Sequence, residues 1–157
     1  MKKDTYIAVV GPSAATPAEH ALGEAVGRLI AEAGAVLVCG GLGGLMEAAA
    51  SGCAAAGGRS VGVLPGERAD ANPYLTVAVA TGMGEARNAI VVRTADAVIA
   101  VAGEFGTLSE IALALKMGKP VVGLGTWQLA KDGQAVDAIV AVATPEEAVS
   151  WALRSVS

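Results

Sequence analysis

Short apolar segments alternate with longer segments in which apolar residues recur every three or four positions, along almost the whole chain. The short segments have the length of strands, and we expect strands over residues 6–10, 35–39, 59–64, 75–80, 97–101, 120–124 and 138–142. The longer segments predict helices over residues 17–33, 45–56, 85–94, 108–117 and 145–154. Residues 125–135 fit neither pattern and are expected to form a loop.

The expected strands are apolar at consecutive positions, so both of their faces should be covered. Such strands, separated by helices, are typical of a doubly wound, mostly parallel sheet. The sequence therefore predicts a Rossmann-like three-layer α/β/α fold with about seven strands. No repeat, low-complexity tract or linker divides the chain, and residues 1–157 are expected to form a single nucleotide- or phosphate-binding domain.

Composition and charge narrow the classes of partner. The net charge is −4 and no basic stripe appears, which argues against a nucleic-acid partner. No apolar run is long enough to span a membrane. The segment YIAVVG follows an N-terminal charge but is shorter than the core of a signal peptide, and Asp4 precedes it, so we interpret it as a strand of a cytoplasmic protein. Cys39 and Cys53 lack metal-ligand spacing, and we expect both to be buried, with no metal site.

Three Thr-x-x-Glu motifs precede apolar segments, at residues 16–19, 107–110 and 144–147. The first and third place proline directly after the threonine, which is typical of a helix start with a capping box. The second has no such proline, and Gly103 and Gly106 precede its threonine directly after a strand. Two interpretations stay open: Glu110 caps a helix, or it lies in the wall of a phosphate-binding loop.

Two further glycine turns follow expected strands, in VVGPS (residues 9–13) and CGGLGGLMEAA (residues 39–49). Their spacing fits neither a dinucleotide fingerprint nor a Walker loop, so NAD binding and ATP hydrolysis are not expected. Because the carboxyl ends of parallel strands share one edge, the turns predict a site for a mononucleotide or another phosphorylated small molecule. The candidate binding residues are Gly11, Ser13, Gly40, Gly41, Gly43, Gly44, Met46, Asn88, Gly103, Glu104, Gly106 and Thr107.

Arg87 lies at the start of the expected helix 85–94. A cation there opposes the helix dipole. Either the arginine is exposed at the surface, or a bound anion offsets this cost. His20 is the only histidine and is expected at the surface, which leaves no Ser–His or Cys–His nucleophile system.

The segments VVGPS, CGGLGGLMEAAASGCAAAGGRSVGVLPG, ANPY, GMGEARNAIVV and GEFGTLSEIALALKMGKPVVG together resemble the Lonely Guy superfamily of Rossmann-like proteins. Within it, the chain is most similar to the bacterial branch grouped with molybdenum-cofactor carrier proteins. The resemblance spans about residues 7–125. It implies a homodimer or higher oligomer, with helix 85–94 as a candidate contact, and a bound AMP-like nucleotide or molybdopterin, with no cofactor required.

The enzymes of this superfamily hydrolyse the N-glycosidic bond of cytokinin nucleoside 5′-monophosphates. By resemblance, Arg87 and Glu110 match their catalytic pair, and Gly103, Gly106 and Thr107 match their phosphate loop. A carboxylate can stabilise the oxocarbenium character of this reaction and activate water, while arginine holds phosphate or ribose oxygens. Many such proteins carry a lysine decarboxylase label, but the sequence offers no placed Schiff-base lysine for it.

Three positions depart from the pattern of the enzymes. Their Pro-Gly-Gly is Ala102-Gly103-Glu104 here, the lysine after their arginine is Asn88, and the glycine after Gly-Leu-Met is Glu47. A carboxylate at position 104 would repel phosphate if it pointed into the loop. We therefore favour a binding protein for a nucleotide or phosphorylated cofactor, with a nucleoside 5′-monophosphate phosphoribohydrolase using Glu110 and Arg87 as the alternative.

Overall fold

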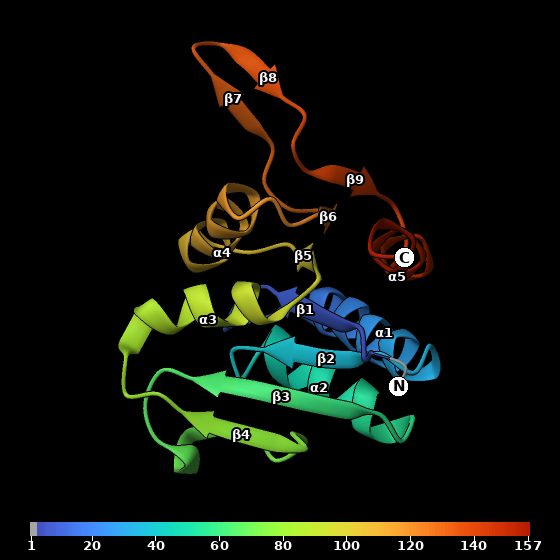
Figure 1. Cartoon of the computed structure of the whole chain (residues 1–157), viewed down its shortest axis with the longest axis vertical. Coiled ribbons are helices and arrows are strands. Elements are labelled where there is room, and N and C mark those ends of the chain that lie inside the picture. The colour runs from blue at the N-terminus through green and yellow to red at the C-terminus, as the bar shows by residue number, and fades with distance from the viewer. Residues whose placement is uncertain (1–2) are drawn as a thin grey trace.

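The computed structural model describes residues 3–157 as a seven-stranded parallel sheet between two layers of helices (Figure 1). Met1 and the lysine after it lie outside the described residues. The strands of the sheet are β1 (Tyr6–Val10), β2 (Val36–Cys39), β3 (Arg59–Leu64), β4 (Val77–Ala80), β5 (Ala97–Val101), β6 (Val121–Leu124) and β9 (Val140–Val142). The helices are α1 (Pro17–Glu32), α2 (Leu45–Ala55), α3 (Arg87–Thr94), α4 (Phe105–Lys116) and α5 (Pro145–Ser155), with one-turn 3-10 helices η1 (Arg68–Asp70) and η2 (Gly84–Ala86).

The order of the strands in the sheet is β4-β3-β2-β1-β5-β6-β9, and each pairs in parallel with its neighbours. The chain winds outward from β1 to β4, then returns to add β5 on the other side of β1. This reversal is the topological switch point at which ligands of open α/β sheets bind. The predicted Rossmann-like α/β/α fold is confirmed.

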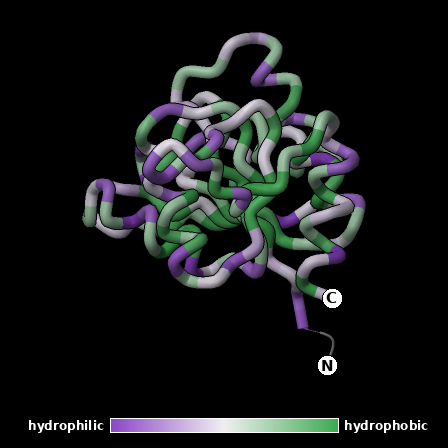
Figure 2. The backbone as a smooth tube through the Cα atoms, turned by 90° about the horizontal axis from the view of Figure 1, so that it is seen from above, coloured by the Kyte–Doolittle hydropathy of each residue, from purple (hydrophilic) through white to green (hydrophobic). Residues whose placement is uncertain are grey.

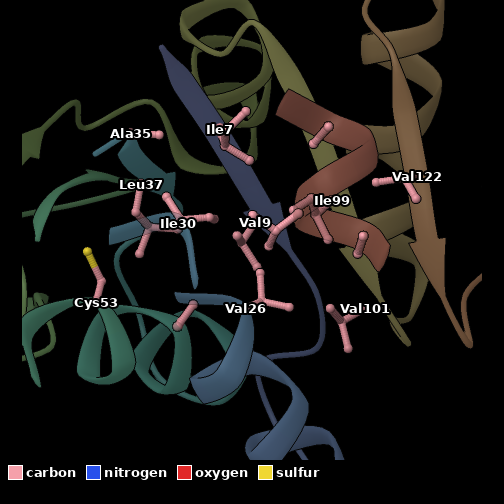
Figure 3. Close-up of a cluster of buried hydrophobic side chains, with 14 of the residues drawn as sticks. Ile7, Val9, Val26, Ile30, Ala35, Leu37, Cys53, Ile99, Val101 and Val122 are labelled. Atoms are coloured by element: carbon pink, nitrogen blue, oxygen red, sulfur yellow. The ribbon is translucent and has the colours of Figure 1, made fainter. Parts of the chain in front are cut away.

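Two hydrophobic clusters hold the layers together. Ile7 and Val9 of β1 point to the face covered by α1, α2 and α5, where they pack with side chains of β2, β5 and β6 (Figure 3). Ala8 and Val10 point to the opposite face, covered by α3 and α4. Neighbouring residues of one strand therefore serve both cores, which explains the continuous apolar runs. In Figure 2 the hydrophobic positions gather on the central strands and the hydrophilic ones on the periphery. Within residues 3–157, no helix combines the length and apolarity needed to cross a membrane.

Residues 125–135, which we expected to form a loop, contain most of a β-hairpin. Strands β7 (Leu129–Lys131) and β8 (Gln134–Val136) pair antiparallel and stand apart from the main sheet (Figure 1). The turn residues Asp132 and Gly133 have φ angles of 51° and 75°. Asp-Gly favours such two-residue turns because both central residues need a positive φ. The Asp-Gly dipeptide was the sequence signal that could have predicted this hairpin. The strands beside it are too short to show an alternating apolar pattern.

Helix α4 begins at Phe105, three residues before the predicted start at 108. Its N-cap is Glu104, whose side chain makes no capping hydrogen bond, and Thr107 already lies in the first turn. The interpretation of Glu110 as a capping residue is therefore wrong. The motifs at 16–19 and 144–147 do form complete capping boxes, with both reciprocal hydrogen bonds. The local reason is the preceding loop, where φ is 48° at Ala102 and 110° at Gly103, so the chain turns into the helix early.

Candidate functional site

A cavity of about 450 Å³ lies where the strand order reverses, beyond the carboxyl ends of β1, β2 and β5. Its walls come from the loops after β1, β2, β3 and β5 and from the first turns of α3 and α4. The volume is within the range of small-molecule sites. The lining residues are Val9, Val10, Gly11, Pro12, Ser13, Ala14, Gly40, Leu42, Met46, Pro65, Glu85, Arg87, Asn88, Glu104, Gly106, Thr107 and Glu110.

Arg87 is the cation of this cavity, and it is buried, with 9% of its surface exposed. Its Nη1 donates to Asn88 Oδ1, and its Nη2 donates to the Gly40 carbonyl oxygen at 3.5 Å. Its Nε is buried without a hydrogen-bond partner anywhere in the described chain. The sequence left two interpretations of Arg87, an exposed surface arginine or a cation that a bound anion stabilises. The interpretation as an exposed surface arginine is wrong.

Gly40 makes room for this guanidinium. A Cβ at position 40 would lie 2.7 Å from Arg87 Nη2 and 2.7 Å from Met46 Sδ. Any side chain would therefore displace the arginine or the methionine. The glycine after β2 is explained by the close approach of Arg87 and needs no phosphate contact.

Glu110 lies in the second turn of α4, beside Arg87 in the cavity wall. Its Oε1 is 4.0 Å from Arg87 Nη1, and 7% of its surface is exposed. Burial raises the pKa of the Glu110 carboxyl from 4.5 to about 7, although the Arg87 charge acts to lower it. The effect of burial on this pKa is larger than that of the Arg87 charge. The reason is that the guanidinium donates its hydrogen bonds to Asn88 and Gly40 and none to the carboxylate. A carboxyl that exchanges its proton near neutral pH can act as a general acid or base.

Asn88 links α3 to the start of α4. Its Nδ2 donates to Ser109 Oγ at 3.1 Å, and Ser109 Oγ donates to the Gly106 carbonyl oxygen at 2.7 Å. The amide oxygen accepts from Arg87 at the same time. Asn88 therefore orients both the arginine and the first turn of α4, and its own polar groups are engaged within the protein.

The first turn of α4 presents free backbone donors to the cavity wall. The first helical hydrogen bond runs from Leu108 N–H to the Glu104 carbonyl oxygen, so the N–H groups of residues 105–107 have no partner in the helix. The strained residue Ala102 before it is held from two sides. Its N–H donates to the Leu124 carbonyl at 2.9 Å, and its own carbonyl accepts from Thr126 Oγ1 at 2.6 Å. Such over-determined strain is typical of ligand sites.

The charges of the cavity are arranged by depth. Arg87 and Glu110 are buried at its base, whereas Glu85 and Glu104 are exposed at its mouth. Glu104 thus lines the cavity, at the position where the enzymes that the chain resembles have glycine. Within residues 3–157, no cluster of His, Cys, Asp or Glu side chains is suited to hold a metal ion.

The structure brings most of the predicted site residues together. Those that line the cavity are Gly11, Ser13, Gly40, Met46, Arg87, Asn88, Glu104, Gly106, Thr107 and Glu110. Those that do not line it are Gly41, Gly43, Gly44 and Gly103. Gly44 is the N-cap of α2 with φ 64°, and Gly103 packs against Thr107. At these two positions, glycine allows the backbone conformation and the close packing that the chain adopts there.

Sequence reasoning did not find several wall residues. Glu85 and Pro65 reach the cavity from η2 and from the end of β3, and Leu42 from the loop after β2. Asn72 is a further supporting residue: its Nδ2 donates to the Leu42 carbonyl at 3.0 Å and holds that loop. Of these four residues, only Asn72 lies in a recognisable sequence motif, the segment ANPY. Glu85, Pro65 and Leu42 lie in no local motif that would have marked them.

Comparison with known proteins agrees with this architecture. The family model described as the SLOG cluster4 family matches residues 4–149. An uncharacterised protein of Archaeoglobus fulgidus is 42% identical over 149 residues, which are 95% of each chain. The structure of the molybdenum cofactor binding protein of Rippkaea orientalis matches with a TM-score of 0.89 and 32% identity, over 100% of both chains. That of the Moco carrier protein of Chlamydomonas reinhardtii matches with a TM-score of 0.85 and 31% identity, over 98% of each.

Proposed function

This chain belongs to the SLOG cluster4 family, and on that basis we propose that it binds a nucleotide or a phosphorylated cofactor of the molybdopterin kind and holds it without turnover. This membership confirms the resemblance to the Lonely Guy superfamily and its carrier branch. Two solved structures similar to it are of proteins that bind or carry the molybdenum cofactor. We propose that a ligand of the same chemical kind binds in the cavity of this chain.

The observation that carries the proposal is the unpaired Nε of Arg87. A buried donor without a partner costs about 1–3 kcal/mol. The donor belongs to a residue that lines the cavity, and a ligand oxygen that draws the guanidinium toward the cavity would remove this cost. Arginine is well suited to phosphate because its donors match two oxygens at once.

The first turn of α4 supports the same ligand chemistry. The free N–H groups of residues 105–107 and the positive end of the helix dipole favour an anion. Arg87 lines the same cavity as this turn. We infer that a phosphate binds between them and that the heterocycle extends toward the mouth. Three of the four charged residues on the wall are carboxylates, which fits a small molecule better than a nucleic acid.

The test is calorimetric titration with molybdopterin, GMP and AMP as probes, using wild type, Arg87→Met and Arg93→Met. Arg93 is exposed in the last turn of the same helix and serves as the matched control. Loss of a charge-assisted contact should weaken binding in Arg87→Met by roughly 10- to 100-fold. Arg93→Met should bind like wild type. Equal affinity in all three proteins would contradict the proposal.

Hydrolysis of nucleoside 5′-monophosphates is the second candidate, and the environment of Glu110 favours it. A carboxyl with a pKa of about 7 beside an arginine can activate water in glycosidic cleavage. The loop before α4 argues against it. Ala102 adopts a positive φ that proline cannot adopt, so the Pro-Gly-Gly loop of the enzymes cannot follow this path.

Release of free base from AMP and from the isopentenyladenine riboside monophosphate separates the two candidates. Base release by wild type that disappears in Glu110→Gln, while binding persists, would establish the hydrolase. Binding without release supports the carrier.

We also infer that the protein works as a homodimer or higher oligomer in the cytoplasm. Helix α3 contributes less to a contact than its sequence suggests, because Val91 is fully buried in the core of the same chain. The edge strand β4 exposes Val77 and Val79 instead. Both cysteines are free and buried, as is typical of proteins in a reducing compartment.

A further inference from the structure

We propose that the cavity selects a heterocycle with two adjacent N–H donors, such as the 2-amino-4-oxo ring of guanine or a pterin, and that Glu104 accepts hydrogen bonds from both. This inference rests on the proposed function and names the class of ligand. It assigns a role to the residue that departs from the phosphate loop of the enzymes.

The first step is the polarity of the cavity. Arg87 and Glu110 are 9% and 7% exposed at its base, and the Arg87 Nε there lacks an acceptor. Glu85 and Glu104 are exposed at the mouth. An anionic group at the mouth would meet two carboxylates, whereas at the base it meets the Arg87 cation beside a single carboxyl, Glu110, whose pKa burial raises to about 7. The phosphate of a ligand is therefore directed inward and its ring outward.

The second step is the chemistry of the mouth. An ionised carboxylate accepts hydrogen bonds at two oxygens and donates none. A 2-amino-4-oxo ring offers an amino group and a ring N–H side by side, which matches the two oxygens. The corresponding edge of adenine offers one amino donor beside a ring nitrogen with a lone pair. Against a carboxylate, that lone pair is repelled, so adenine forms one bond where guanine forms two.

The third step distinguishes Glu104 from Glu85. The backbone of Glu104 is fixed because its carbonyl oxygen accepts from Trp127 Nε1 at 3.2 Å and from the Leu108 N–H at 3.0 Å. Trp127 in turn packs against Phe105, with ring centroids 5.6 Å apart. The Glu104 carboxylate has no hydrogen-bond partner of its own within residues 3–157. Glu85 lies on a single 3-10 turn, where its carbonyl oxygen accepts from the Arg87 backbone N–H but has no second hydrogen bond of the kind that Trp127 gives Glu104. A fixed backbone with a free carboxylate is the arrangement that recognition of a ring edge requires.

The experiment measures the affinities of GMP, IMP and AMP by calorimetry at pH 8. The three nucleotides share ribose and phosphate and differ in the ring edge, and IMP lacks only the 2-amino group of GMP. Wild type should bind GMP about tenfold more tightly than AMP, with IMP between them. IMP loses one of the two charged hydrogen bonds, and AMP also keeps one but sets a ring lone pair against the carboxylate. Glu104→Gln presents one acceptor and one donor, so it no longer accepts from both N–H groups and should lose the preference for GMP over AMP. Glu146→Gln changes an exposed glutamate that does not line the cavity, so it is the matched control and should keep the preference for GMP.

The outcomes separate this inference from the proposed function. Equal binding of GMP and AMP by wild type, or an unchanged ratio in Glu104→Gln, would overturn the role of Glu104 while leaving phosphate binding intact. Absence of binding for all three nucleotides and for ribose 5-phosphate would overturn the proposed function, and the inference with it.

Discussion

At the scale of single residues, burial changes the chemistry that the sequence letters suggest. Glu110 and Glu104 are both glutamates of the same ten-residue segment, but the first is buried beside Arg87 and the second is exposed. Burial raises the pKa of the Glu110 carboxyl to about 7. One segment thereby supplies a proton-exchanging group at the base of the cavity and an acceptor at its mouth.

This burial predicts how stability varies with pH. Because the folded state holds the Glu110 proton more tightly than the unfolded state, the free energy of unfolding should fall as pH rises from about 4.5 to about 7. Glu110→Gln removes the titrating carboxyl, and with it this fall in the free energy of unfolding. The variant should gain stability relative to wild type between pH 4.5 and pH 8, by on the order of 3 kcal/mol at most. Thermal unfolding of both proteins at the two pH values measures it, and a constant difference would contradict the assigned pKa.

At the scale of secondary-structure elements, three similar motifs have two different roles. Thr16 and Thr144 accept from the backbone N–H three residues later and are true N-caps. Thr107 lies inside α4, lines the cavity and caps nothing. Proline after the threonine distinguishes the caps, because it is compatible only with the first helical turn.

Replacing each of these threonines by valine keeps the shape and removes the hydroxyl. Thr16→Val and Thr144→Val should each destabilise the protein by about 1 kcal/mol, since a helix donor loses its partner. Thr107→Val should change stability much less and instead weaken ligand binding. Urea unfolding of the three variants tests this, and an equal loss of stability in all three would restore the capping role of Thr107.

At the scale of the whole molecule, β4 forms an apolar edge of the sheet. Val77 and Val79 are 49% and 41% exposed, and they pair in register with Val61 and Val63 on the face that carries α3 and α4. Strand β4 contains no charged residue. Edge strands usually carry charge or proline to prevent pairing, so this edge favours association with a second copy.

Light scattering after gel filtration checks the oligomeric state. Wild type should run as a dimer or larger species, and Val77→Lys should shift it toward the monomer because a charge would be buried in the contact. Val140→Lys places the same charge on the exposed valine of the opposite edge strand, β9, and should leave the assembly unchanged. A monomeric wild type at tens of micromolar protein would contradict the prediction.

The sequence by itself determined the helices and the strands of the main sheet, though not the hairpin β7–β8, together with the α/β class and the edge of the sheet that carries the candidate site. Residues 6–10 and 59–64 were predicted with the bounds that the structure has, because a strand buried on both faces leaves a continuous apolar run. The two proline-marked caps were predicted from adjacent residues for a similar reason: the interactions that define them are local.

Only the tertiary structure decided which of those residues face the cavity and in what electrostatic state. Arg87 is buried because Gly40, 47 residues away in the chain, leaves room for it, and Glu110 has a raised pKa because α3 and α4 pack together around it. Helix α4 starts at Phe105 because Ala102 is held in a positive φ by hydrogen bonds to residues 124 and 126. These properties arise from contacts between distant segments, and no local pattern in the sequence encodes such contacts.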